Sequence, residues 1–131
     1  MSGTVAVVTG AAGDIGLAIA GRLAQSHDFV VLADIDGDAV EAVCRGRSEA
    51  FVPAVCDVTL ECDCQKLAEL ASSKGAVTTL VNNAGAARAV SLGDTTASIW
   101  RQDAALNLEA AFLCFQCFEP YLRGTRGSLV N

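Results

Sequence analysis

Three glycines, Gly10, Gly13 and Gly16, lie within the segment TGAAGDIG. The segment follows a short apolar run and precedes a stretch with helical spacing, which is the context in which a glycine-rich turn binds phosphate. Glycines let the backbone approach a phosphate closely, and the free N–H groups at the start of a helix favour an anion. A tight strand-to-helix turn without a ligand uses the same residues, so the spacing alone leaves both interpretations open.

The same segment contains an acid, Asp14, where an anionic phosphate would approach. This side chain could cap the following helix by accepting hydrogen bonds from backbone amides. At an effective dielectric constant of ~20, two unit charges about 6 Å apart repel by roughly 3 kcal/mol. We therefore expect Asp14 to weaken the binding of a dinucleotide.

A second acid, Asp34, closes the apolar run FVVLAD. An aspartate at such a position can accept hydrogen bonds from the ribose hydroxyls of adenosine and would repel a 2′-phosphate. This favours NAD over NADP, and we include the neighbouring Ile35 in the candidate cofactor site. The alternative is a solvated turn aspartate within the acidic segment ADIDGD.

Polar or small residues also close the next two apolar runs. Asp57 could contact an adenine amino group while Val58 packs on the ring, although Asp57 could equally cap a helix. In the segment NNAG, the Asn83 amide can tie neighbouring strand ends together, and the small Ala84 and Gly85 leave room for a cofactor.

Hydrophobic periodicity predicts the elements that position these residues. We expect strands over residues 4–9, 29–34, 51–56, 77–83 and 127–131, and helices over 14–25, 37–46, from Thr59 to Gly75, and from Asp94 or Thr95 to about Leu122. Alternating strands and helices predict an α/β fold with a doubly wound parallel sheet, whose ligand binds outside the carboxyl ends of the strands. Pro53 indicates that the third strand lies at an edge.

Composition excludes several classes of protein. The chain has 131 residues, 52% of them hydrophobic, so we expect one packed domain and no disorder. The net charge is −6 without a basic stripe, so no nucleic-acid or membrane partner is expected. Because no apolar run could span a bilayer and no signal peptide is evident, we expect a cytoplasmic protein.

The chain has six cysteines: Cys44, Cys56, Cys62, Cys64, Cys114 and Cys117. A zinc site would require the pairs at 62–64 and 114–117 to converge, and a redox motif would lie near the start of a helix. The second pair lies deep within an apolar helical run. We therefore expect reduced, mostly buried thiols and no metal site.

Taken in order, TGAAGDIG, ADID, CDV, NNAG, ALNLEAAF and GSLVN resemble the N-terminal half of a classical short-chain dehydrogenase/reductase across essentially the whole chain. The resemblance implies a Rossmann-like three-layer α/β/α fold with strand order 3-2-1-4-5. It implies an NAD(P)-binding domain over residues 1–131 that is C-terminally truncated at the fifth strand. It also implies an NAD-dependent oxidoreductase of a small alcohol or carbonyl substrate, and a homo-oligomer when intact.

The resemblance also implies the site residues. The candidate cofactor-binding residues are Gly10, Gly13, Asp14, Ile15, Gly16, Asp34, Ile35, Asp57, Val58, Asn83, Ala84 and Gly85. Asn107 would belong to the catalytic set, since in the family this asparagine kinks its helix and holds a water in the proton relay. The family has glycine at the position of Asp14, whereas here the glycine falls one place earlier.

The family also uses a serine and a tyrosine and lysine spaced Y-x-x-x-K, which this chain lacks. The one tyrosine, Tyr121, is followed four residues later by Thr125, and both lysines lie upstream. We therefore expect a fragment that is inactive alone and whose intact parent is the enzyme. Two alternatives stay open: a non-catalytic NAD-binding module, and a scaffold that uses the fold without a ligand.

Overall fold

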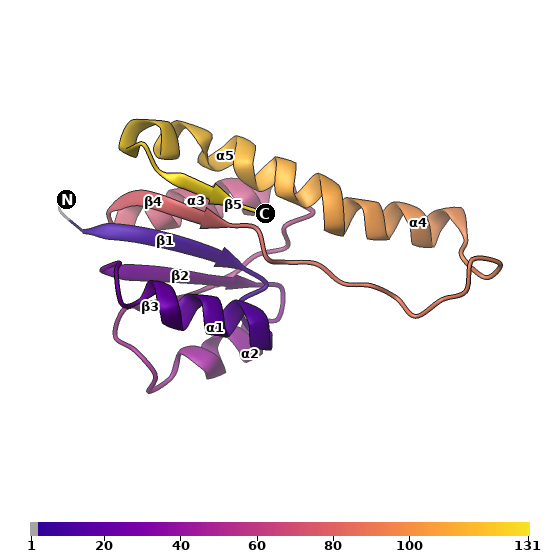
Figure 1. Ribbon diagram of the computed structural model, residues 1–131, viewed down its shortest axis with the longest axis horizontal. Helices are drawn as coiled ribbons and strands as arrows, with labels where there is room; N and C mark the ends of the chain where they lie inside the picture. Colours follow the sequence, from indigo (N-terminus) through magenta and orange to yellow (C-terminus); the bar gives the residue numbers. More distant parts are fainter. Residues whose placement is uncertain (1–2) are drawn as a thin grey trace.

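The computed structural model describes residues 3–131 as a five-stranded sheet between two layers of helices (Figure 1). The strands are β1 (Thr4–Thr9), β2 (Phe29–Asp34), β3 (Phe51–Val55), β4 (Ala76–Val81) and β5 (Ser128–Val130). The helices are α1 (Asp14–Leu23), α2 (Gly37–Cys44), α3 (Glu61–Lys74), α4 (Ala97–Ala104) and α5 (Ala110–Thr125), with a π-helical segment η1 (Ala105–Glu109) before α5. The order β3-β2-β1-β4-β5, with every pair parallel, confirms the predicted Rossmann-like fold.

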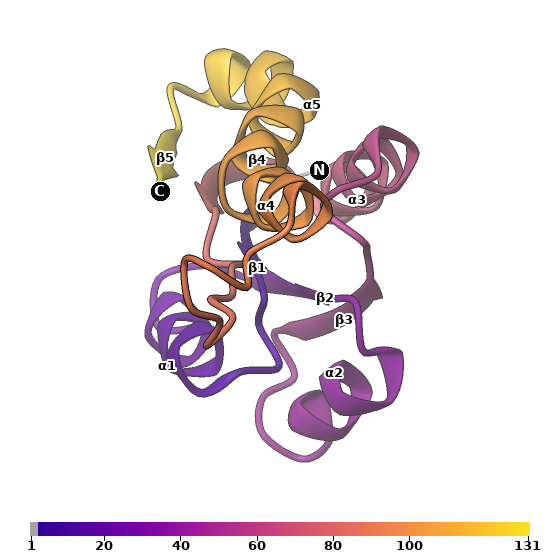
Figure 2. The same ribbon diagram turned by 90° about the vertical axis from the view of Figure 1, so that its right-hand side faces the viewer.

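Alternate residues of the central strands contribute to two separate cores. Val5 and Val7 of β1 pack with residues of α3 and α5, whereas Ala6 and Val8 pack with residues of α1 and α2. Figure 2 shows these two helix layers on opposite sides of the sheet. Because the interior of β1 is buried on both faces, its residues 5–8 form an unbroken apolar run.

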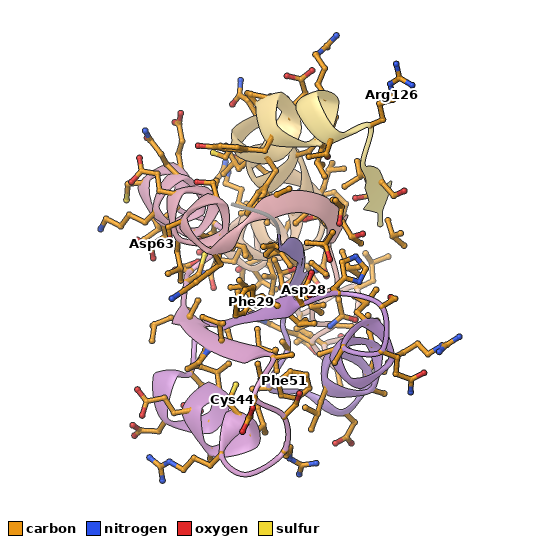
Figure 3. All side chains as sticks on the ribbon, turned by 90° about the vertical axis from the view of Figure 1, so that its left-hand side faces the viewer. Asp28, Phe29, Cys44, Phe51, Asp63 and Arg126 are labelled. Carbon is orange, nitrogen blue, oxygen red and sulfur yellow. The ribbon has the colours of Figure 1, made fainter. Side chains whose placement is uncertain are left out.

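One acidic side chain connects the amino ends of β1 and β2. Asp28 accepts hydrogen bonds from the N–H of Thr4 at 2.7 Å and from its hydroxyl at 3.0 Å, which ties the start of β1 to β2. These two bonds lower the pKa of the Asp28 carboxyl below its usual range. Figure 3 views this end of the sheet and shows Cys44 and Phe51 where α2 meets β3, at the margin of one core.

Some element boundaries differ from the prediction. The N–H and hydroxyl of Thr59 both bond to Asp57, so Thr59 does not cap α3. Helix α4 takes Thr96 as its N-cap and does not begin at Asp94 or Thr95, which lie in a turn closed by hydrogen bonds to residue 91. In β3 the proline lies on an edge strand, as predicted. Within residues 3–131, no helix has both the length and the apolar character needed to cross a bilayer.

Candidate functional site

A cleft of about 650 Å³ lies at the carboxyl ends of the first four strands. Its lining includes eight of the twelve candidate cofactor residues: Gly10, Gly13, Asp34, Ile35, Asp57, Val58, Ala84 and Gly85. They come from the last residue of β2 and from the loops that follow β1, β2, β3 and β4. The parallel topology therefore gathers residues from four separate segments at one edge of the sheet.

The glycine turn forms one wall of the cleft. Gly10 adopts a φ of +62°, and a Cβ there would lie 2.8 Å from the Cα of Ala84. A Cβ on Gly16 would overlap the Gly10 carbonyl oxygen. A Cβ on Gly13 would meet only that same oxygen, at 3.6 Å, so the protein leaves open space at the start of α1. Packing requires Gly10 and Gly16, whereas the space at Gly13 is available to a ligand.

The start of α1 presents unused hydrogen-bond donors. Helix α1 begins after Gly13, and no side chain caps it, so the predicted cap by Asp14 is wrong. The first N–H groups of a helix have no partner within the helix, and the helix dipole makes this end positive. Together with the open space at Gly13, these donors fit an anionic phosphate.

Three candidate residues of the same turn, Asp14, Ile15 and Gly16, lie outside the cleft lining. Asp14 and Ile15 are exposed and line a separate, mostly apolar groove between α1 and the ends of β4 and β5. The groove has a volume of about 670 Å³. Asp14 therefore lines this groove and not the cleft in which we expected it to oppose a phosphate.

Asn83 ties the end of β4 to the end of β1, as expected for its amide. Its Nδ2 donates to the carbonyl oxygens of Thr9 at 3.1 Å and Gly10 at 3.2 Å. The buried hydroxyl of Thr9 in turn accepts from the N–H groups of Asn83 at 3.1 Å and Ala84 at 3.0 Å. Sequence reasoning missed Thr9, although a polar residue ending an otherwise apolar strand was a usable signal.

Asp34 connects the glycine turn to the following strand. Its Oδ2 accepts from the N–H of Ala12 at 3.0 Å, and its Oδ1 accepts from the N–H of Asp36 at 3.1 Å. Asp36 instead caps α2 by accepting from the N–H of Ala39. A carboxylate has about four acceptor positions, so each oxygen of Asp34 keeps one after these bonds. Asp34 therefore closes a turn through Asp36 and also holds Ala12 of the glycine turn.

Asp57 and Val58 form the neighbouring part of the cleft. The Oδ1 of Asp57 accepts from the N–H of Thr59 at 2.9 Å and from its hydroxyl at 2.6 Å, so Asp57 closes a turn and does not cap α3. The N–H of Asp57 donates to Asp63 at 3.0 Å. Val58 is almost fully buried and provides an apolar surface beside the Asp57 carboxylate.

Asn107 fastens the loop after β4 to the long helix. Its Nδ2 donates to the carbonyl oxygens of Ala86 at 2.8 Å and Asp103 at 2.9 Å, and its Oδ1 accepts from the N–H of Ala86 at 3.0 Å. Asn107 lies in η1, where the N–H of Ala110 donates to the carbonyl of Ala105, five residues earlier. The predicted single long helix is therefore α4 and α5 joined through this π-helical turn (Figure 1).

The cleft lining also includes seven residues outside the candidate cofactor set. They are Cys56, Thr59, Ala86, Arg88, Gln102, Ala105 and Leu106. Arg88 lies across from α4, where it donates to Gln102 at 2.8 Å and pairs with Asp103 at 3.4 Å. No local pattern marks Gln102, Ala105 and Leu106, because the approach of the loop after β4 to α4 and η1 is a tertiary contact.

Several curated proteins are similar to this chain over nearly its whole length. The chain is 34% identical over 132 residues to meso-2,3-butanediol dehydrogenase of Serratia marcescens, covering 97% of this chain and 51% of that protein. It is 37% identical over 135 residues to L-fucose dehydrogenase of Oryctolagus cuniculus, covering 99% of this chain and 46% of that protein. The chain therefore spans about half the length of the curated relatives it matches.

One solved structure is also similar to this chain over nearly its whole length. A metagenomic short-chain oxidoreductase in complex with NADP superposes with a TM-score of 0.87 at 31% identity, covering 98% of this chain and 61% of that chain. The sequence pattern that defines the short chain dehydrogenases matches residues 4–131. Since this match extends over nearly the whole chain and the fold agrees, the protein belongs to the short-chain dehydrogenase family.

Proposed function

We propose that this chain is the cofactor-binding part of an NAD-dependent oxidoreductase, and that residues 1–131 form one nucleotide-binding domain. The observation that carries the proposal is the hydrogen bond between the Asp34 carboxylate and the N–H of Ala12. It places an acid suited to ribose hydroxyls against a glycine turn suited to phosphate, in one cleft. When bound, the nicotinamide would accept a hydride from an alcohol carbon or donate one to a carbonyl carbon.

The first step is to hold the pyrophosphate. The N–H groups at the start of α1 would donate to it, and the open space at Gly13 would let it approach the backbone. Gly10 and Gly16 would act indirectly, since they allow the turn to close against Ala84 and Asn83.

The second step is to select the adenosine half of the cofactor. The free acceptor positions on Asp34 would bind the ribose hydroxyls, and its negative charge would oppose a 2′-phosphate. Ile35 and Val58 would contact the adenine ring, while the second carboxylate oxygen of Asp57 would accept from the adenine amino group. This arrangement favours NAD over NADP.

The third step is to shape the reactive end of the cleft. Asn83, Ala84 and Gly85 would leave room for the nicotinamide ribose, because the side chains after the strand end are small or turned into hydrogen bonds. The Asn107 amide hydrogen-bonds to both the N–H and the carbonyl oxygen of Ala86. We propose that it positions this loop beside the reacting groups.

The proton donor is expected outside these 131 residues. Tyr121 lies on α5, and the residue four places later is Thr125, whose hydroxyl donates to the carbonyl of Val77. A chain of these residues alone would therefore be a non-catalytic NAD-binding module, which is the second candidate function. Turnover of a small alcohol by this chain would exclude that second candidate.

Titration calorimetry with NAD⁺ and NADP⁺ tests the proposal. We expect NAD⁺ to bind about tenfold or more tightly than NADP⁺, since a screened repulsion of 1.4 kcal/mol already gives a factor of ten. Asp34→Asn should narrow this ratio. Asp38→Asn removes an equal charge four residues away, from an exposed position on α2, and should leave the ratio unchanged. Equal or tighter binding of NADP⁺ would contradict the assignment.

A further inference from the structure

Three buried cysteine side chains lie beside the cleft. Cys56 is 2% exposed, and Cys64 and Cys114 are fully buried. The Sγ atoms of Cys64 and Cys114 lie 3.4 Å apart, although the two residues are 50 positions apart in the chain. They bring together α3 and α5, which pack on the same face of the sheet (Figure 2). Cys64 of the 62–64 pair therefore contacts Cys114 of the 114–117 pair.

The cluster is connected to the cleft. The Cys64 thiol donates to the carbonyl oxygen of Val58 at 3.4 Å, and Val58 lines the cleft. Cys56 also contributes to the lining of the cleft. A small cavity of about 10 Å³ lies between Val58 and Cys114, which is close to the volume that one water-sized molecule needs.

The three thiols differ in how readily they ionise. Hydrogen bonds from Cys114 and Cys56 lower the pKa of the Cys64 thiol. Hydrogen bonding to Cys64, together with burial, raises the pKa of the other two thiols. The thiolate is the nucleophile in thiol chemistry, and a lowered pKa favours it at Cys64, whose Sγ lies at contact distance from that of Cys114.

Metal binding is not supported by this cluster. Among residues 3–131, no group of three or more histidine, cysteine or acidic side chains is arranged to hold a metal ion. All six cysteines are free thiols. Two sulfur atoms in contact, from different helices, instead suit the formation of one bond between them.

We propose that Cys64 and Cys114 are a redox-active pair that closes into a disulfide between α3 and α5 when hydrogen peroxide is present. The Cys64 thiolate attacks a peroxide oxygen, so that an S–O bond forms, the O–O bond breaks and the released hydroxide takes a proton to become water. The Cys114 sulfur then attacks the Cys64 sulfur. The S–S bond forms, the S–O bond breaks, and the departing hydroxide combines with the Cys114 proton as a second water. Two electrons pass from the sulfur atoms to the peroxide.

The disulfide would alter the cleft as well as join the helices. A disulfide requires an S–S distance of about 2.05 Å, so the two sulfur atoms must approach by roughly 1.3 Å. Cys64 then no longer has a thiol hydrogen to donate to the Val58 carbonyl. Oxidation would therefore change the apolar floor of the cleft through Val58, which lines the cleft and accepts the hydrogen bond from Cys64.

Peptide mapping of the whole chain tests the pair. The reduced protein is exposed to hydrogen peroxide, denatured, alkylated with iodoacetamide and digested without reduction. We expect one linked peptide pair containing Cys64 and Cys114, two hydrogens lighter than the sum of its parts and released by dithiothreitol, with the other cysteines alkylated. Alkylation of both Cys64 and Cys114, or a link from Cys64 to Cys117 one helical turn further along α5, would overturn the proposal.

Two variants control for the fold and for chance pairing. Cys117→Ser removes a half-buried thiol outside the contact and should keep the link at wild-type yield. Cys114→Ser should abolish it and leave a Cys64 sulfenic acid that dimedone traps. If Cys114→Ser does not fold, dimedone trapping at Cys64 in the wild-type chain, before the link accumulates, serves the same purpose, and its absence would count against the proposal. These measurements need no cofactor, so their outcome is independent of the proposed function.

Discussion

Two glycines of helix α1 provide a sharp test of the turn geometry. A Cβ on Gly16 would overlap the carbonyl oxygen of Gly10 and would lie 2.8 Å from the Cα of Ala11 and from the Nδ2 of Asn83. Ordinary contacts of a Cβ begin near 3.4 Å, so backbone atoms would have to move by about half an ångström or more. Such overpacking costs about 1–3 kcal/mol. Gly21 is exposed, and a Cβ there meets nothing within 4 Å.

The matched variants are Gly16→Ala and Gly21→Ala. In a helix interior, replacing glycine by alanine stabilises by about 0.5–1 kcal/mol, so the two changes should have opposite signs. We expect a difference of roughly 2–4 kcal/mol in the free energy of unfolding, or about 10 °C in melting temperature. Thermal unfolding followed by circular dichroism measures this difference, and calorimetry should show weaker NAD⁺ binding only in Gly16→Ala. Equal melting temperatures for the two variants would refute the reasoning.

Four further predictions concern other parts of the chain. Asp14→Asn should change NAD⁺ affinity less than about threefold, because the carboxylate lies outside the cleft lining; a change near 100-fold, the equivalent of ~3 kcal/mol, would show that it opposes the phosphate. Asn107→Ala removes three hydrogen bonds and should lower stability by about 1–2 kcal/mol in urea titrations. The lowered pKa of Asp28 means that its contribution to stability is present above its ordinary value of 3.8 and is lost as pH falls through the folded-state pKa. In urea titrations at a series of acidic pH values, the free energy of unfolding should therefore decrease less steeply with falling pH in Asp28→Asn than in the wild-type chain. The apolar groove beside α1 should make the 131-residue chain self-associate in size-exclusion chromatography, and Ala18→Lys should shift it towards monomer.

Much of the fold could be predicted from local pattern. Apolar runs such as FVVLAD indicate strands buried on both faces, and their alternation with amphipathic stretches indicates a doubly wound parallel sheet. Because parallel strands end at one edge, Asp34, Asp57 and the residues around Asn83 could be expected to face one cleft. Pro53 marked an edge strand because it has no N–H to donate.

Helix starts were harder to predict. Thr59, Asp94 and Thr95 are all residues that favour N-caps, yet each closes a local turn by hydrogen bonding to a nearby residue. Capping and turn formation use the same short polar side chains, so sequence cannot separate them. The outcome depends on where the chain must enter the next layer of the fold.

The sequence by itself determined where the strands and most of the helices lie and which polar or small residues close the strands, because periodicity and turn chemistry act over a few neighbouring residues. The strand order was predicted from the family resemblance. Only the tertiary structure decided which side chains touch. It placed Asp14 in the lining of a separate groove and brought Arg88 into an ion pair with Asp103. It also brought the Sγ atoms of Cys64 and Cys114, on two different helices, to within 3.4 Å of each other. Such contacts are set by how whole helices pack on the sheet, and residues 50 positions apart carry no local sign of that packing.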